Sequence, residues 1–462
     1  MPRVLCLLLP LIALPGRAAA HASEQAVVLL LPTGFYVAGG VASVVLTVLL
    51  VSVLPDRWAL SLFRPLALGR SGGRGGAGPL WTSAAVFLAL GLLCVIGEIG
   101  PETPVRNPLP QAVWTVFWVA IVLWQGIVGD IWRWVNPWSG PYALVRRLGA
   151  RPLLRYPRWL GHWPGLASFL AFAAVLLAHP APADPDQLAP MVAIYWAVHF
   201  AGMVVFGPKW RRRAEGLTVL MTNYARLAAV SKARGRWRLG LPGWRYLRFA
   251  PPPVALAVTM LVALAVGSFD GLNETFLWLG WIGQNPLEFG GRSAVVAQNL
   301  WGLVGACAAL TAVFAATVWL GAQLAGAPGT FATSFRRLAP AILPIALGYH
   351  FAHYMPSFLV DIQYTIRTAS DPLGLGWNLF GTAGLYVTTG FFNTVDTVRV
   401  IFLAEAGAVV IGHVVAIAMS HALAVGLHRS HRKAAISQIP LATFMVAYTL
   451  FGLWLLASPR GA

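Results

Sequence analysis

A series of ten apolar runs constrains the fold of this chain more than any other feature. Each run is long enough, or nearly long enough, to cross a bilayer, and they fall at 27–54, 80–97, 112–129, 165–179, 190–206, 252–268, 299–324, 338–359, 400–427 and 438–457. A membrane-spanning helix needs about 20 residues, so 165–179 and 252–268 are short. Only 10% of the 462 residues are charged, whereas soluble domains have about 25%. The sequence therefore predicts an all-α, polytopic transmembrane helix bundle of about ten spans.

The N-terminus has the three parts of a secretory signal peptide. Arg3 supplies the positive charge, an apolar stretch follows, and Ala18 and Ala20 provide the small residues of a cleavage site. We expect 1–20 to be removed, which leaves 21–462 as a single integral-membrane helical domain. His21 would then be the first residue, and a free amine and an imidazole together can chelate copper. The alternative is an incidental histidine.

The distribution of charge predicts the orientation of the bundle. If the mature N-terminus is outside, the outer segments contain only five cations: Arg106, Arg292, Arg367, Arg399 and Arg460. The other Lys and Arg of the mature chain lie in the inner connections, as the positive-inside rule requires. We therefore predict a multi-pass membrane protein whose inner connections face the cytoplasm, with both ends of the mature chain outside.

The cations of the inner connections account for the net charge of +18, and their densest stretch is 209–248, where arginine is interleaved with tryptophan and tyrosine. Such a mixture can bind nucleic acid. Here it joins two spans on the inner side of the membrane, so the expected partner is the anionic headgroups of the lipid bilayer. No nucleic-acid partner is expected.

Several ionisable side chains lie within the apolar runs. The stretch GYHFAHYMPSFLVD (348–361) contains His350 and His353, which are three residues apart and share a helix face. His199 lies near the middle of its run, and Glu405 and His413 lie two helical turns apart in the ninth run. Ionisable groups are costly inside a bilayer unless they are paired, and they commonly mark functional sites. His421, near the inner end with His428 and His431 beyond it, is interpreted as an interfacial histidine.

Histidines together with a carboxylate match the ligand preferences of zinc, copper and iron. We predict that His350, His353 and His413 converge on one divalent metal, with zinc as the first choice and copper or iron as alternatives. His199 is a further candidate ligand. The opposing interpretation is a set of core histidines whose hydrogen bonds are satisfied by neighbouring helices.

Two carboxylates would complete the chemistry of such a metal site. Glu405 would be a further ligand or the base that accepts a proton from water. Asp361, at the end of the 348–361 stretch, would hold a histidine in place through a hydrogen bond.

Three segments resemble a family of bacterial integral-membrane proteins, the fenitrothion hydrolases. These segments are HASEQAVVLLLPTGFYVAGG (21–40), GDIWRWVNPWSGPY (129–142) and LPIALGYHFAHYMPSFLVD (343–361). The resemblance implies hydrolysis of an organophosphorus triester with release of a nitrophenol, but it transfers no catalytic residue. A metal ion would suit this reaction because it lowers the pKa of bound water toward about 7. An apolar small-molecule substrate of this kind would reach the site through the lipid.

Two other functions stay open. The chain could be a copper or other metal-handling permease or tolerance protein, with His21 capturing the ion outside and the intramembrane histidines acting as a relay. It could also be a membrane assembly factor without catalysis.

Overall fold

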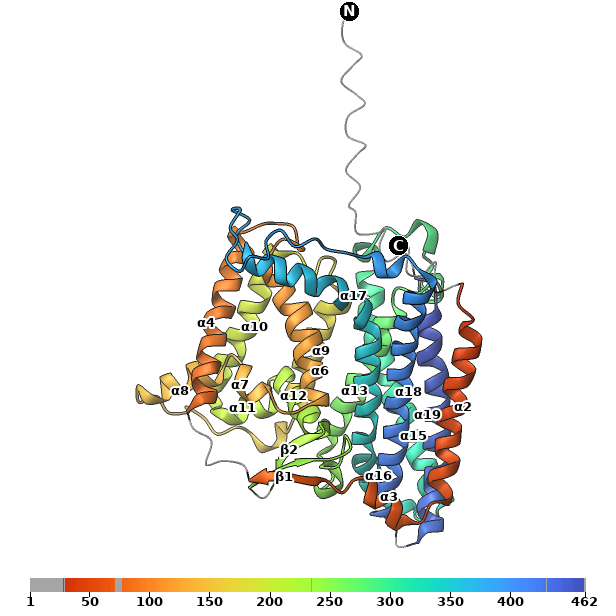
Figure 1. Cartoon of the computed structure of the whole chain (residues 1–462). Helices are drawn as coiled ribbons and strands as arrows, with labels where there is room; N and C mark the ends of the chain where they lie inside the picture. The colour runs from red at the N-terminus through yellow and green to blue at the C-terminus, as the bar shows by residue number, and fades with distance from the viewer. Residues whose placement is uncertain (1–27, 29, 71–76, 234, 429, 461–462) are drawn as a thin grey trace, which may run out of the picture.

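The computed structural model describes residues 28, 30–70, 77–233, 235–428 and 430–460 (Figure 1). The predicted signal peptide at 1–20 and His21 lie outside the described residues. Within the described chain, helices form most of the structure, and the long ones run side by side in a bundle.

Eight helical segments of the described chain are long and apolar enough to cross a membrane. They are α2 (Thr33–Val53), α4 (Gly78–Ile99), Pro108–Ile127, α10 (Pro185–Phe206), α13 (Val254–Leu272), Arg292–Leu324, α18 (Val395–Val425) and α19 (His431–Ala457). The third consists of α5 (Pro108–Pro110), the π-helix η1 (Gln111–Ile121) and α6 (Val122–Ile127), and the sixth of η5 (Arg292–Val295) and α15 (Val296–Leu324). The predicted bundle of membrane-spanning helices is confirmed, with eight candidate spans in the described chain.

The other two predicted spans are also helical but differ from these eight. α9 (Trp163–Ala178) has 16 residues, which is shorter than the hydrocarbon thickness of a bilayer requires. α17 (Leu343–Ser370) has 28 residues, but its second half is polar and it contains Pro356. Figure 1 shows this second half running across the end of the bundle.

Short elements gather at one end of the bundle, the lower end in Figure 1. They include α3 (Asp56–Leu62), α7 (Trp132–Val135), α8 (Ser139–Arg147), α11 (Pro208–Arg213), α12 (Gly216–Leu227) and α16 (Phe331–Leu338). We call this end the basic face, because the cation-rich segment 209–248 lies there. The remaining short helices are η2 (Arg158–Leu160), η3 (Tyr246–Arg248), α14 (Phe276–Trp281), η4 (Pro286–Glu288), η6 (Pro328–Thr330), η7 (Ala339–Ile342) and η8 (Gly390–Phe392).

A three-stranded antiparallel sheet also lies on the basic face, which the all-α prediction did not include. Its order is β1 (Leu66–Arg70), β3 (Arg236–Leu239) and β2 (Val230–Ala233). Ala233 pairs with Arg236 at the end of the β2–β3 hairpin, where Gly235 has φ +70°. The segment 209–248 is therefore a folded cap with α11, α12, a hairpin and η3 rather than a simple connection.

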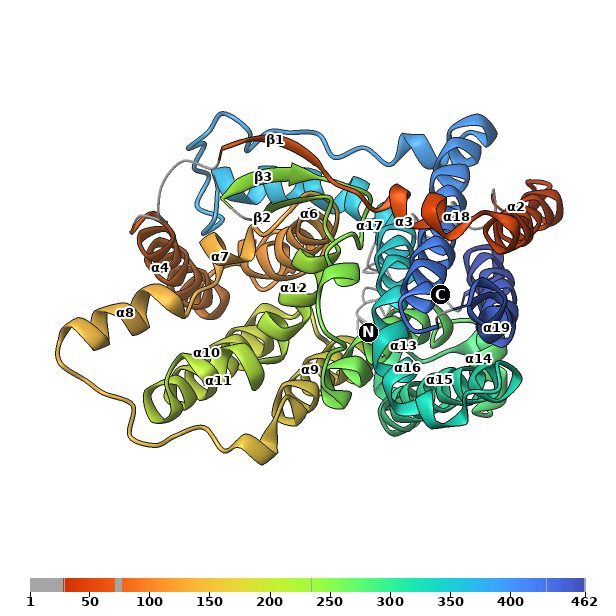
Figure 2. The same ribbon diagram turned by 90° about the horizontal axis from the view of Figure 1, so that it is seen from below.

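α13 lies near the centre of the molecule in Figure 2, and most of its side chains are buried against α9, α15 and α17. α17 and α18 cross in close contact. A Cβ on Gly348 would lie 2.5 Å from the carbonyl oxygen of Ala408, and one on Gly412 would lie 2.7 Å from that of Pro344. Small residues at such a crossing allow two backbones to approach within a membrane. This contact determines where the side chains of α17 point.

Candidate functional site

His350 lies against the π-helix η1. Its Nε2 is 2.8 Å from the carbonyl oxygen of Trp118, and its ring meets the Trp118 ring edge-on with centroids 5.0 Å apart. A carbonyl oxygen can only accept, so the proton is on Nε2 and the neutral ring has its lone pair on Nδ1. π-Helical turns are rare in proteins overall, but those that do occur are often found at functional sites.

His353 pairs with a carboxylate from another helix. Its Nε2 is 3.2 Å from Oδ2 of Asp270, which lies near the end of α13. The hydroxyl of Tyr354 donates a hydrogen bond to the same carboxylate. The Tyr354 ring lies between the two histidines, 4.7 Å from the His350 ring and 4.8 Å from the His353 ring. We call Asp270, His350, His353 and Tyr354 the interior site.

A cavity of about 20 Å³ borders the interior site between η1, α13 and α17. Its polar lining residues are Tyr224, Asp270, His350 and Tyr354. A cavity needs roughly 10–15 Å³ and two or more polar partners to hold a water molecule. The interior site therefore has room for one water beside a histidine and a carboxylate.

The predicted convergence of His350, His353 and His413 is not found. On α18, Nδ1 of His413 donates to the Val409 carbonyl oxygen at 2.8 Å, and the ring lies 6.5 Å from that of Tyr448 on α19. Among the described residues, three potential ligands do lie within 4.8 Å of one another, but these are Asp56, His421 and His431. α17 and α18 do touch, but through Gly348. His350 is two residues later, about 200° around the helix, and so faces η1 instead.

The two predicted catalytic carboxylates lie on α18 and in the second half of α17. Glu405 is buried on α18, two turns before His413. Asp361 is half-buried in the second half of α17. The carboxylate that contacts His353 is Asp270. Asp270 is thus in position to orient a histidine, the role that the sequence predicts for Asp361.

His199 belongs to a third environment, between α9, α10 and α11. Its Nε2 is 3.0 Å from Ser168 Oγ, and Trp210 Nε1–H donates to its Nδ1 at 3.2 Å. Both ring nitrogens are thus used in hydrogen bonds to neighbouring helices. This arrangement fits a structural histidine better than the predicted metal ligand.

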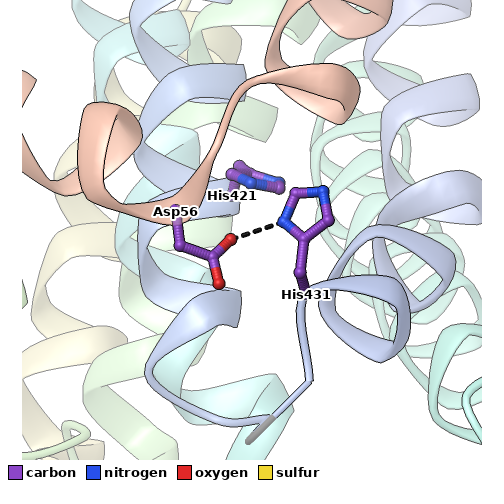
Figure 3. A group of neighbouring side chains, drawn as sticks. All are labelled: Asp56, His421 and His431. Atoms are coloured by element: carbon purple, nitrogen blue, oxygen red, sulfur yellow. Dashed lines mark hydrogen bonds and ion pairs between the residues drawn. The ribbon is translucent and has the colours of Figure 1, made fainter.

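A group that does have the spacing of metal ligands lies at the basic face (Figure 3). It consists of Asp56 on α3, His421 on α18 and His431 at the start of α19. Nδ1 of His431 is 2.5 Å from Oδ1 of Asp56, and the rings of His421 and His431 are 6.0 Å apart. His421 is buried, and its Nε2 has no hydrogen-bond partner among the described residues. We call these three residues the Asp56 group.

The Asp56 group offers two nitrogens and one oxygen, a donor set that zinc and copper accept. Bond lengths of about 2.0–2.2 Å put tetrahedral ligand atoms roughly 3.4 Å apart, so Nδ1 of His431 and Oδ1 of Asp56, at 2.5 Å, would have to move apart on binding. Asp56 and His431 are half-exposed, which allows access from the basic face. Three protein ligands leave one position open for water or another ligand.

Sequence reasoning missed two components of these sites. Asp270 could have been noticed as a carboxylate just beyond the C-terminal end of the 252–268 run. Asp56 gave no such signal, because it is 365 residues from His421 and 375 from His431. Comparisons with known proteins add no assignment, since no family model, curated protein or solved structure matches the chain.

Proposed function

We propose that the protein is a membrane-embedded hydrolase of apolar phosphotriesters, organophosphorus compounds such as fenitrothion, and that the interior site is its catalytic site. The resemblance of three segments to fenitrothion hydrolases supports the substrate class. The observation that carries the proposal is the water-sized cavity bordered by Asp270, His350 and Tyr354.

In the proposed reaction, Nδ1 of His350 accepts a proton from water in this cavity. The water oxygen forms a bond to phosphorus, the bond from phosphorus to the aryl oxygen breaks, and a nitrophenolate leaves. Asp270 positions the other members of the site, since it accepts from both Tyr354 and His353. A general base contributes about 10²–10⁴-fold to such a reaction.

The predicted zinc set does not fit this arrangement, because His350 faces Trp118 while His413 faces Tyr448. The proposed step therefore uses the protein side chains alone, with no role for His413 or Glu405. A triester is much larger than a cavity of about 20 Å³. Substrate can reach the water only if helices that line the cavity separate.

We also propose that the protein lies in a bacterial inner membrane with the basic face in the cytoplasm. The positive-inside rule supports this orientation, because the cation-rich segment 209–248 lies on that face. Asp184 caps the start of α10, and Lys209 follows the end of the same helix, so the two lie at opposite ends of a span. Asp270, near the far end of α13, would then place the interior site in the outer half of the membrane.

The test is turnover of a nitrophenyl phosphotriester by the purified protein, with and without a metal chelator. We expect release of nitrophenol that survives chelation and is lost in His350→Ala and Asp270→Asn. No turnover by the folded wild-type protein, with or without added zinc, would refute the hydrolase. Turnover that requires zinc would keep the activity but refute the metal-free step.

The second candidate function is metal handling, and the Asp56 group favours it. A half-exposed site with three ligands can take up an ion and release it, which a permease or tolerance protein requires. Uptake of zinc or copper into vesicles that contain the purified protein would test this. Transport that depends on Asp56 and His421, without phosphotriester turnover, would select this function over the first.

A further inference from the structure

A second and larger cavity, of about 410 Å³, lies at the basic face between α9, α11, α12 and α13. Four cationic side chains line it: Lys209, Arg212, Arg213 and Arg226. Lys209 and Arg212 are exposed at its rim, while Arg213 and Arg226 are half-buried. Like charges in one cavity repel each other and raise the local concentration of anions.

No carboxylate neutralises these cations. Within the described chain, none of the four takes part in an ion pair. Glu215, the nearest acid in sequence, is occupied elsewhere. Its Oε1 accepts from the Leu217 N–H at 2.8 Å and from the Tyr195 hydroxyl at 2.5 Å, and its Oε2 accepts from the Thr218 N–H at 2.6 Å. The positive charge of the cavity is therefore left without a counter-ion from these residues.

A buried donor in the cavity lining also lacks an acceptor. Asn223 is 1% exposed, and its Nδ2 has no hydrogen-bond partner among the described residues. The Tyr246 hydroxyl contacts only the carbonyl and Oδ1 oxygens of Asn223. Nδ1 of His162, another lining residue, is buried and likewise has no partner in the described chain. A buried donor without an acceptor costs about 1–3 kcal/mol, which a ligand oxygen would recover.

Aromatic rings hold the two inner guanidinium groups in position. Arg213 lies over the Tyr156 ring at 6.0 Å, and Arg226 lies over the Phe249 ring at 5.4 Å. Burial, together with the charges of Arg213 and Arg226, lowers the pKa of His162 from 6.5 to about 4. His162 is therefore neutral at pH 7 and can donate one hydrogen bond without adding charge.

We propose that this cavity binds the phosphate group of a phosphate monoester or diester. Guanidinium groups match phosphate oxygens in charge and in hydrogen-bond geometry, and Asn223 Nδ2 supplies a further neutral donor. The cavity is within the range of about 300–1,000 Å³ that small ligands occupy. The phosphate could belong to a soluble molecule or to a lipid headgroup. This site is separate from the interior site and does not depend on the hydrolase proposal.

The first experiment titrates inorganic phosphate into the protein in phosphatidylcholine nanodiscs, against chloride at equal ionic strength, by calorimetry. We expect saturable binding that is at least tenfold weaker in Arg213→Gln and Arg226→Gln. Asn223→Leu keeps the net charge and should also weaken binding several-fold. Arg147→Gln, an exposed cation on the same face that does not line the cavity, should stay within twofold of wild type.

The second experiment separates the two sources of phosphate. Nanodiscs are prepared with phosphatidic acid added to the phosphatidylcholine, and the phosphate titration is repeated. Competition by the lipid would assign the site to a headgroup, and unchanged binding would assign it to a soluble ligand. The proposal is overturned if phosphate binding is not saturable, or if Arg147→Gln weakens it as much as Arg213→Gln while all variants keep the same helical content.

Discussion

The interior site and the Asp56 group both combine histidine with aspartate, but their surroundings differ. In the interior site, the Nε2 of each histidine has a partner, the Trp118 carbonyl for His350 and Asp270 for His353. In the Asp56 group, His421 has a buried nitrogen without a partner among the described residues, and Asp56 and His431 are half-exposed.

This difference separates two kinds of chemistry. Hydrogen bonds from three helices fix the interior site, which suits proton transfer with a bound water. The Asp56 group lies where helices begin and end, so its side chains can adjust to an ion. Under the two proposals, the same residue types would serve catalysis in one place and ion binding in the other, and each half of this comparison can be tested.

The largest effect is expected from His350→Ala. Loss of the general base should lower phosphotriester turnover by at least about a hundredfold, measured as nitrophenol release. His413→Ala is the matched control, because His413 is also a buried histidine within a span. It should retain turnover within about threefold, and equal losses in both variants would contradict the assignment of the site to His350.

The second effect concerns metal affinity at the Asp56 group. Removal of one of three ligands in His421→Ala should weaken binding of zinc or copper by at least about tenfold, since even partners of ligands contribute about 10–100-fold. Isothermal calorimetry on the purified protein measures it. His428→Ala, between α18 and α19 but outside the group, should bind as wild type does. If His421→Ala weakened metal binding less than His428→Ala does, the Asp56 group would be refuted as the metal site.

The third effect tests the crossing that keeps His350 and His413 apart. Gly348→Ala would place a methyl group 2.5 Å from the Ala408 carbonyl oxygen, and such overpacking costs about 1–3 kcal/mol. Thermal unfolding in detergent should show the loss. The control is Gly407→Ala on α18, where a Cβ would meet nothing within 4 Å. Equal stability of the two variants would mean that the close contact is not as described.

The smallest effect is a pH dependence at the basic face. His162 has a pKa of about 4 in the folded protein against an ordinary 6.5, so between these values the unfolded chain binds more protons. Stability should therefore rise with pH across this window and be lost as the pH falls from 6.5 toward 4. Unfolding measured at several pH values should show a shallower slope in His162→Gln. An unchanged slope would exclude His162 as the titrating group.

The sequence by itself determined the class of the fold and the location of its charge. Each of the ten apolar runs is largely helical, because a long apolar segment has few alternatives to a buried helix. The cation-rich segment 209–248 gathers at one end, as its position between two spans predicts. Local pattern sufficed for these features, since each depends on residues close together in the chain.

Only the tertiary structure decided which side chains meet. His350 and His353 share a helix face, as their spacing predicts, but their partners are Trp118 and Asp270 from distant segments. The phase of α17 is set by the contact of Gly348 with α18, which directs His350 away from His413. His421, interpreted from sequence as an interfacial histidine, lies beside His431 and Asp56, although Asp56 is 365 residues away in the chain. Spacing along one helix fixes angles within that helix, whereas a site also requires the rotation and crossing of its neighbours, which packing alone determines.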